Sequence, residues 1–528
     1  MKTNILISGY FGLFPVGRHS ISFLSCLLKD IDNDIYINTD FLTNEGNEVL
    51  NLFFKKELES RRIKFDKELD TDFVYDFNFF PSPLPSLSIP QTDIDKFEKK
   101  KAKLKACYPV FDGSVPPLEW IDIINNKFDI CLSPSAYCTH NLKRYGVKID
   151  CMELECLVLM EEMLKIKPKE LKQKKFRFGC ISANETRKNL IPLLEAFSLT
   201  FSKKDNVELF VHAIQRTDVI CSEQDLDEAY EKYSKNSNII LHKGFISHNE
   251  ILKMWESFNA YICPQSVTGY FTTPAEAMAV GIPCILSGIP VHKELIKYVP
   301  ENNNLFFVKH DLMESFMHGV FSYRNLGVKF DFDLSEYVKA LRNLFNKRNT
   351  LFSEENIYQR KKGISYLTVK HLSPKYNTLV HPKVIYISNM SQKISDEGEL
   401  FISQKLAEKY INFKLYKGKI IEKSVVSEFS YPEENEVIFK IIERTAETSQ
   451  RIFLRCMEKS LKEKKADNIF DKYLEKIRNR IYKYQVVYPL IFIYWELKIY
   501  CALKKIFYNP NKKTKNLPYE SKFIRSKR

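Results

Sequence analysis

The residues best placed for chemistry lie in one stretch, 260–295. Residues 260–263 form a short apolar run that predicts a buried strand. Pro274 then opens a helix, for which Thr273 is the expected N-cap, and Gly281 ends it. A helix N-terminus at the end of a parallel strand binds anions, because its free N–H groups converge there with the helix dipole. The stretch therefore predicts an anion site.

Glu276 adds a carboxylate to this site, since it lies in the first turn of the same helix. Phosphates at the helix N-terminus and a sugar hydroxyl on Glu276 would together hold a nucleotide diphosphate sugar. An ordinary βαβ unit of an α/β protein explains the same features about equally well. These residues alone leave both interpretations open.

The same stretch resembles the donor-binding segment of family-4 (group 1) glycosyltransferases, in which seven residues separate two Glu residues. Glu276 takes the place of the second Glu, and Pro274 and Gly281 fit the pattern around it. Thr268 stands where the first Glu is expected, and Phe271 stands where the pattern has its second Gly. The resemblance therefore implies a donor site in which one of the two signature carboxylates is missing.

The resemblance also assigns a cationic loop to the donor. Residues 176–181 predict a strand, and Lys188 in the loop after it matches a phosphate-binding Lys of the family. Arg187 would stand in for an Arg that many relatives carry at the position of Cys180. A cation there neutralises the leaving diphosphate. Without an anion nearby, a basic first turn of the helix expected over 190–200 would oppose the helix dipole, so we favour the functional interpretation.

A third donor segment begins at Gly244 and resembles a family motif whose backbone lies near the nucleotide base. Within it, Ser247 and Glu250 have the spacing of a capping box that starts a helix. The resemblance thus implies Lys188 and Glu276 as catalytic residues, and it implies these donor-binding residues: Arg187, Thr268, Gly269, Phe271, Thr272, Thr273, Pro274 and Phe245.

The first half of the chain supplies candidates for the acceptor side. A strand over 5–8 leads into a Gly-bearing loop and then a helix from about Arg18. The resemblance places Gly12, Gly17 and Arg18 across the cleft from the donor, although glycines that only permit a positive φ explain the loop equally well. Asp112 occupies a place where many relatives have Glu, and a surface Asp beside a turn is its commoner explanation.

Strands alternate with helices through both halves, which predicts an α/β protein with two facing Rossmann-like domains, the GT-B architecture of the resembling family. We expect an acceptor-side domain over 1–165, a donor domain over 176–380 and a mainly helical basic extension over 384–528. Residues 95–105 are expected to form a solvated helix of alternating charge. The first loop lacks the G-x-G-x-x-G pattern, so a nicotinamide cofactor is not expected.

The composition is that of a globular protein of 528 residues, of which 44% are hydrophobic. Its 12 cysteines are scattered without a C-x-x-C pair, and several lie in strand-like runs. This distribution favours buried reduced thiols in a cytoplasmic protein over a disulfide framework. The start of the chain lacks the pattern of a signal peptide. The resemblance implies no metal or other cofactor, because cations and helix N–H groups would do that work.

The charge is concentrated at the end of the chain. Residues 462–528 contain 18 Lys and Arg against 6 Asp and Glu, which is +12 of the total +14. A basic tail on a nearly neutral body indicates an anionic surface as its partner. Within residues 486–508, the apolar run is ten residues long and is broken at Glu496, which is too short to span a bilayer. With its aromatic and Lys residues the segment fits an interfacial helix at the inner membrane face. A helix packed on the body is the alternative.

Two functions follow from these observations. The first, which the resemblance implies, is a glycosyltransferase that moves a sugar from a nucleotide-sugar donor to a glycan or lipid-linked acceptor, with retention, in the synthesis of cell-envelope or surface polysaccharide. The second is a catalytically degenerate GT-B protein that serves as a membrane-associated binding or assembly partner, which Thr268 favours. Nucleic-acid binding is not expected, because no recognised reading module accompanies the basic tail. The donor sugar, the acceptor and the linkage depend on pocket shape and stay open.

Overall fold

The computed structural model describes residues 2–451, except 13–14, 85–91, 157–159, 172–174, 216–222, 245, 303, 310–311, 318–323, 383, 388–391, 396–397, 417–418, 423–439, 441 and 449. The chain divides into two compact units, Met1–Glu447 and Thr448–Arg528. The basic tail over 462–528, the interfacial segment over 486–508 and Phe245 lie outside the described residues, so those predictions stay predictions.

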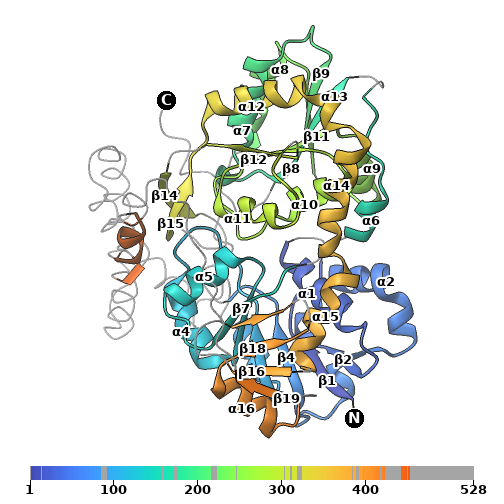
Figure 1. The fold of residues 1–528 in the computed structure, drawn as a ribbon, viewed down its shortest axis with the longest axis vertical. Coiled ribbons are helices and arrows are strands. Elements are labelled where there is room, and N and C mark those ends of the chain that lie inside the picture. Colours follow the sequence, from blue (N-terminus) through green and yellow to red (C-terminus); the bar gives the residue numbers. More distant parts are fainter. Residues whose placement is uncertain are drawn as a thin grey trace, which may run out of the picture. The chain divides into compact units, whose positions relative to one another are not determined.

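Seven parallel strands form the first sheet, in the order β3-β2-β1-β4-β5-β6-β7 (Figure 1). The strands alternate with helices along the chain, as a Rossmann-like domain requires. The apolar side chains of β1, such as Ile5 and Ile7, are fully buried. The strands are β1 Thr3–Ile7, β2 Asn33–Ile37, β3 Ile63–Phe65, β4 Tyr75–Phe80, β5 Ala102–Cys107, β6 Ile130–Ser133 and β7 Asp150–Glu153, and the main helices are α1 Pro15–Leu27, α2 Asn44–Glu59, α3 Thr92–Glu98, α4 Leu118–Lys127 and α5 Ala136–Arg144.

The single helix expected over 95–105 is wrong. Helix α3 ends at Glu98, and the following residues form strand β5 between β4 and β6. The reason is visible in the side chains, because Leu104 and Ala106 are buried while Lys103 and Lys105, which alternate with them, are not. That alternation has the period of a strand. The expectation of a helix rested on the charge pattern and overlooked this period.

Six parallel strands form the second sheet, in the order β10-β9-β8-β11-β12-β13. The predicted helix over 190–200 is confirmed as α7, and the capping box of Ser247 and Glu250 is confirmed at the start of α9. With the first sheet, this confirms the predicted α/β fold of two Rossmann-like domains. The strands are β8 Phe176–Ala183, β9 Val207–Ile214, β10 Ile239–Lys243, β11 Ala260–Cys263, β12 Cys284–Ser287 and β13 Leu305–Val308, and the helices include α7 Leu190–Thr200, α8 Glu223–Ser234, α9 His248–Glu256 and α10 Thr272–Val280.

After the second sheet the chain returns to the first. Helix α12 (Leu334–Asn346) packs on α7, and α14 (Glu354–Ile364) packs on α10. Helix α15 (Val369–Val380) then packs along α1 of the first domain. Helix α6 (Met160–Lys165), at the end of the first domain, also packs on α10. Two crossings of the chain therefore hold α10 near the first domain.

A hairpin made of β14 (Leu312–Met317) and β15 (Arg324–Phe330) also bonds to both domains. The backbone N–H groups of Ser114 and Val115 each donate to the carbonyl oxygen of Leu326, both at 2.9 Å. The N–H of Phe330 donates to the carbonyl oxygen of Ser266, also at 2.9 Å. The hairpin thus joins a loop of the first domain to the loop that follows β11.

The first part of the extension contains a small sheet that the expectation of a mainly helical segment did not include. Its strands lie in the order β17-β18-β16-β19, and helix α16 (Gln404–Asn412) follows β18. The hydroxyl of Tyr410 donates to the carbonyl oxygen of Leu379 at 2.5 Å, and the N–H of Ser403 donates to Asp150 at 2.6 Å. The strands are β16 Val384–Ile387, β17 Lys393–Ile394, β18 Leu400–Ile402 and β19 Lys419–Glu422.

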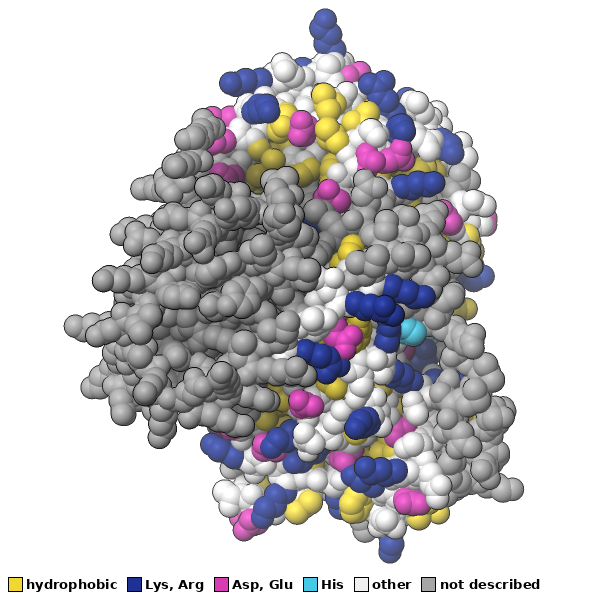
Figure 2. Space-filling view, turned by 90° about the vertical axis from the view of Figure 1, so that its left-hand side faces the viewer, with side chains coloured by type: hydrophobic (Ala, Val, Ile, Leu, Met, Phe, Trp, Pro, Cys, Tyr) yellow, Lys and Arg dark blue, Asp and Glu magenta, His cyan; other side chains and the backbone are white. Residues whose placement is uncertain are grey.

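One hydrophobic core includes side chains of the first sheet, such as Phe79, together with side chains of α10, such as Met278. The described cysteines are all buried and free, which confirms the expected reduced thiols for this part of the chain. None of the helices in the described ranges is long and apolar enough to cross a bilayer. On the face drawn in Figure 2, Lys and Arg side chains are interspersed with Asp and Glu, as expected for a nearly neutral body.

Candidate functional site

Helix α10 is the element on which the site is built. It begins two residues earlier than expected: Phe271 is its N-cap, so the prediction of Thr273 as N-cap is wrong. Pro274 lies in the first turn, where a missing N–H breaks no helical hydrogen bond. Gly281 ends the helix in the left-handed conformation, with φ of +95°, as predicted.

Glu276 of α10 is bonded to Arg18 of α1. Arg18 Nη1 donates to Glu276 Oε1 at 2.8 Å, and Glu276 is only 2% exposed. Burial raises the pKa of the Glu276 carboxyl, and the nearby Arg18 cation partly offsets this. The structure therefore brings together one residue expected on the donor side and one expected on the acceptor side.

Gly12 and Gly17 pack directly on one another at the start of α1. A β-carbon on Gly17 would lie 2.3 Å from the backbone nitrogen of Gly12 and 2.6 Å from its α-carbon. Neither glycine has a positive φ. The explanation from backbone freedom is therefore wrong, and the glycines serve the close approach of two backbone segments. This approach sets the position of Arg18, the next residue of the helix.

Lys188 follows β8, in a short 3-10 turn at Thr186–Lys188. Its ammonium donates to Gln265 Oε1 in the loop that follows β11, the strand next to β8 in the sheet. Burial and the neighbouring Arg187 cation together lower the pKa of Lys188 to about 8. A desolvated cation bonded to a neutral amide has the electrostatic character of an anion site.

Arg187 has a different environment, because two carboxylates hold it. Its Nε lies 2.8 Å from Glu185 Oε2 and 3.5 Å from Asp112 Oδ2. Burial opposes the charge of Arg187, but Asp112 and Glu185 outweigh burial and raise its pKa. Asp112 belongs to the first domain, so this is a second ion pair between a residue expected on the acceptor side and one expected on the donor side.

The loop before α10 is packed tightly against the first domain. Thr268 is 8% exposed, and its Oγ1 donates to the carbonyl oxygen of Tyr270 at 2.9 Å. The carbonyl oxygen of Gly269 accepts from Ser135 Oγ at 3.0 Å. A β-carbon on Gly269 would lie 2.5 Å from Val110 Cγ1, so only glycine fits there.

The remaining donor candidates surround the start of α10. Phe271 is buried, with its ring centroid 4.3 Å from that of Tyr270. Thr272 and Thr273 are partly exposed, and Thr273 bonds to the hydroxyl of Tyr261. Pro274 is buried. The structure thus gathers Thr268, Gly269, Phe271, Thr272, Thr273, Pro274 and Glu276 on one loop and helix start.

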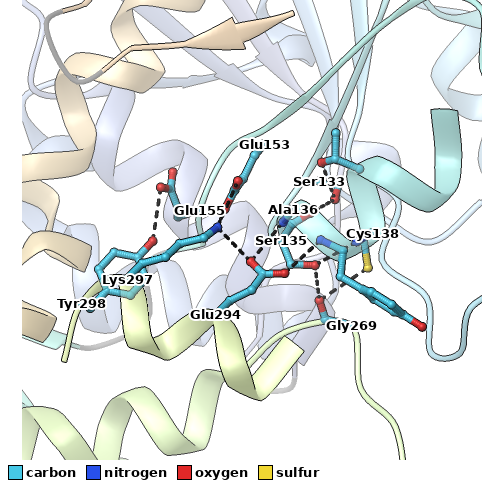
Figure 3. A network of polar contacts seen from close by, with 12 residues as sticks. Ser133, Ser135, Ala136, Cys138, Glu153, Glu155, Gly269, Glu294, Lys297 and Tyr298 are labelled. Carbon is cyan, nitrogen blue, oxygen red and sulfur yellow. Dashed lines mark hydrogen bonds and ion pairs between the residues drawn. The ribbon is translucent and has the colours of Figure 1, made fainter. Parts of the chain in front are cut away.

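A polar network that the sequence did not reveal joins the domains beside this loop (Figure 3). The carboxylate of Glu294 accepts from the N–H groups of Ala136 and Tyr137, at 3.1 and 2.9 Å, at the N-terminus of α5. Lys297 Nζ lies 3.2 Å from both Glu294 and Glu153. Burial raises the pKa of Glu153 to about 7, although Lys297 opposes the shift.

Sequence reasoning also missed the partners of the cationic loop, Glu185 and Gln265, because each is recognised only through a contact between distant segments. Among the residues that the structure describes, no group of three or more His, Cys, Asp or Glu side chains is arranged to hold a metal ion.

Comparison with known families gives one match. Residues 162–320 match the family model described as glycosyl transferases group 1. This segment contains the cationic loop, the loop after β11 and helix α10. No curated protein sequence matches the chain.

Several solved structures have a similar fold at low sequence identity. Anabaena Alr3699/HepE in complex with UDP is 12% identical over 72% of this chain and 99% of that chain, with a TM-score of 0.48. A glycosyltransferase from Rickettsia africae is 12% identical over 72% and 97%, with a TM-score of 0.49. Sucrose-phosphate synthase from Thermosynechococcus elongatus is 10% identical over 72% and 98%, with a TM-score of 0.49.

Proposed function

We propose that this chain, whose residues 162–320 match the model of group 1 glycosyl transferases, transfers a sugar from a nucleotide-sugar donor bound at Lys188 and Glu276. One observation carries the proposal. Lys188 is a desolvated cation whose ammonium bonds to the neutral amide of Gln265 at the ends of two adjacent parallel strands. Such a cation gains most from an anionic ligand, and a diphosphate supplies one.

In the proposed complex, the diphosphate lies between Lys188 and the N-terminus of α10. Negative charge grows on the diphosphate as the bond to the sugar breaks. A fixed cation and free N–H groups stabilise that charge without rearranging. Because these groups neutralise the leaving diphosphate, we propose that the reaction requires no metal or other cofactor.

Glu276 is proposed to accept a hydrogen bond from the ribose. Arg18 bonds to Oε1 of its carboxylate, and a carboxylate has further lone pairs for a second donor. The Arg18 cation favours the ionised form of the Glu276 carboxyl and so partly offsets its burial, and a hydrogen bond from a ribose hydroxyl favours that form as well. Arg187 is already held by Asp112 and Glu185, so Lys188 is the better candidate to bind the diphosphate directly.

The acceptor is proposed to be a glycan or a lipid-linked glycan, and the sugar is proposed to be transferred with retention, in the synthesis of cell-envelope or surface polysaccharide. The +12 charge of residues 462–528 supports a cytoplasmic protein that binds the anionic inner membrane face, where a lipid-linked acceptor would be found. Liposome co-sedimentation with anionic and with neutral vesicles tests this part separately.

A nucleotide-binding protein without turnover is the second candidate, and Thr268 favours it. Its hydroxyl is bonded to the carbonyl of Tyr270 and lies where the resembling family has a carboxylate. Under this alternative, the protein binds a nucleotide sugar but does not release the nucleotide from it.

Isothermal titration with UDP-sugars and GDP-sugars tests the proposal on the wild type, Glu276→Ala and Lys188→Gln. The proposal expects the wild type to bind one nucleotide class and each variant to bind it at least tenfold more weakly. A matched control, Glu355→Gln on the exposed side of α14, should bind as the wild type does. A wild-type protein that binds no nucleotide sugar would overturn the proposal.

A further inference from the structure

Asn189 adopts a left-handed backbone conformation, which residues other than glycine rarely adopt. It lies between the 3-10 turn and α7, with φ of 51° and ψ of 38°. This left-handed conformation is energetically unfavourable for an L-residue, and Asn tolerates it better than most residues do. Among the described non-glycine residues, only Arg61 and Lys414 share a positive φ.

The side chain of Asn189 does not cap its own helix, although Asn is a favoured N-cap. Its Nδ2 instead donates to the carbonyl oxygen of Pro264 at 2.7 Å and to Ser266 Oγ at 2.8 Å. Both partners belong to the loop after β11. The left-handed backbone turns the amide toward that loop instead of toward the first turn of α7.

A backbone bond joins the same two loops. The N–H of Ser266 donates to the carbonyl oxygen of Arg187 at 2.8 Å. Lys188 is the residue before Asn189, and its bond to Gln265 lies between the two partners of Asn189 along the loop. The Asn189 amide therefore fixes the loop at Pro264 and Ser266, on both sides of Gln265, which accepts the hydrogen bond from the Lys188 ammonium.

We propose that Asn189 is a positioning residue for the donor, which holds the Lys188 ammonium and the loop leading to α10 in one fixed arrangement. This inference rests on the proposed function. Asn189 acts through Lys188 and Gln265 and does not itself contact the donor. The strained backbone is retained because it directs an amide with two bonds to the loop after β11.

Two substitutions separate the backbone of Asn189 from its side chain. Asn189→Gly keeps the left-handed conformation without cost but removes both hydrogen bonds. Asn189→Asp keeps the size of the side chain but cannot donate to the Pro264 carbonyl oxygen. Lys414→Gly is the matched control, because it relieves a φ of 56° at an exposed position outside the site.

The experiment measures the Kd of whichever diphosphate, UDP or GDP, the wild type binds, and the exchange rate of the Ser266 amide proton without ligand. Both Asn189 variants are expected to raise Kd about tenfold and to speed amide exchange at Ser266. The donor KM should rise by a similar factor while the acceptor KM stays unchanged, which a general loss of stability would not produce. Lys414→Gly should change none of these quantities.

The outcomes are distinguishable. A wild type that binds neither diphosphate overturns the proposed function and this inference with it. A wild type that binds, with Asn189→Gly within twofold of it or with unchanged exchange at Ser266, overturns the positioning role alone. Equal losses of diphosphate affinity in Asn189→Gly and Lys414→Gly would also overturn the positioning role, because the effect would then come from the change in backbone conformation and not from the lost hydrogen bonds.

Discussion

Arg18 and Glu276 form an ion pair of 2.8 Å between helix α1 of the first domain and helix α10 of the second. The side chain of Glu276 is almost fully buried, and that of Arg18 is 13% exposed. Water therefore screens this pair little, and each charge depends on the other. A residue from the opposite domain thus stabilises the charged form of the carboxyl group proposed to bind the ribose.

Removing Arg18 should destabilise the protein strongly. Arg18→Met leaves Glu276 buried without its cation, and we expect a loss of about 3 kcal/mol in the free energy of unfolding. Lys101→Met removes one partner of an exposed pair with Asp72, and its effect should stay within about 0.5 kcal/mol. Urea unfolding of both variants measures the difference. Similar small losses in both would contradict the importance of the buried pair.

Nucleotide-sugar binding should weaken in alkaline solution. Lys188 has a pKa of about 8, and the charged groups that surround it are Arg187, Glu185, Asp112 and, if ionised, the Cys263 thiol. Lys188 carries its charge below that pKa and loses it above, so affinity should be constant below pH 7 and fall as the pH rises above 8. Calorimetry with a nucleotide sugar is suitable, because its diphosphate does not titrate in this range.

Lys188→Arg provides the control for this pH dependence. Arginine stays protonated throughout, so binding by the variant should be weaker in absolute terms but independent of pH between 7 and 9.5. If the wild type also shows no loss of affinity up to pH 9.5, Lys188 is not the diphosphate ligand.

Stability should fall as the pH rises through neutrality, because of the network around Glu153. Its pKa is raised to about 7, from 4.5 for an ordinary Glu, and Glu294, Glu155 and Lys297 surround it. Between those two values the folded protein binds more protons than the unfolded chain, so its stability decreases with increasing pH. Melting temperatures at pH 5 and pH 8 should differ less in Glu153→Gln than in the wild type. An equal difference in melting temperature in the variant and the wild type would contradict the assignment of this pH dependence to Glu153.

The contact between Gly12 and Gly17 predicts that α1 tolerates no side chain at Gly17. Gly17→Ala would place a methyl group 2.3 Å from the Gly12 backbone nitrogen, and we expect a loss of about 2 kcal/mol. Gly46→Ala, in helix α2, meets its nearest atom, Leu42 Cδ1, at 3.2 Å and should change stability by less than about 1 kcal/mol. Thermal unfolding compares the two, and a stable Gly17→Ala variant would contradict the packing.

Local sequence features predicted the local structure well. The capping box of Ser247 and the end of α10 at Gly281 were predictable because neighbouring residues alone determine them. Strand β5 was missed because lysines that alternate with small apolar residues also suit a solvated helix, and only pairing with β4 and β6 selects the strand.

The candidate site was predictable as a set of residues but not as a set of contacts. Lys188 and Glu276 were identified from the resemblance of their segments to the family motifs. Their partners, Gln265 and Arg18, come from distant parts of the chain, so only the folded structure pairs them. The role of Asn189 was not predictable either, because no sequence pattern indicated its left-handed backbone conformation.

The most direct test of the central claim is the release of nucleotide diphosphate from a panel of UDP- and GDP-sugars, measured with the wild type and Lys188→Gln. We expect the wild type to release the nucleotide from one donor class, slowly with water and faster with a glycan acceptor. Lys188→Gln should lower that rate by at least a hundredfold, because one cation stabilises the leaving group. A wild type without release from any donor, or a Lys188→Gln variant as fast as the wild type, would contradict the account.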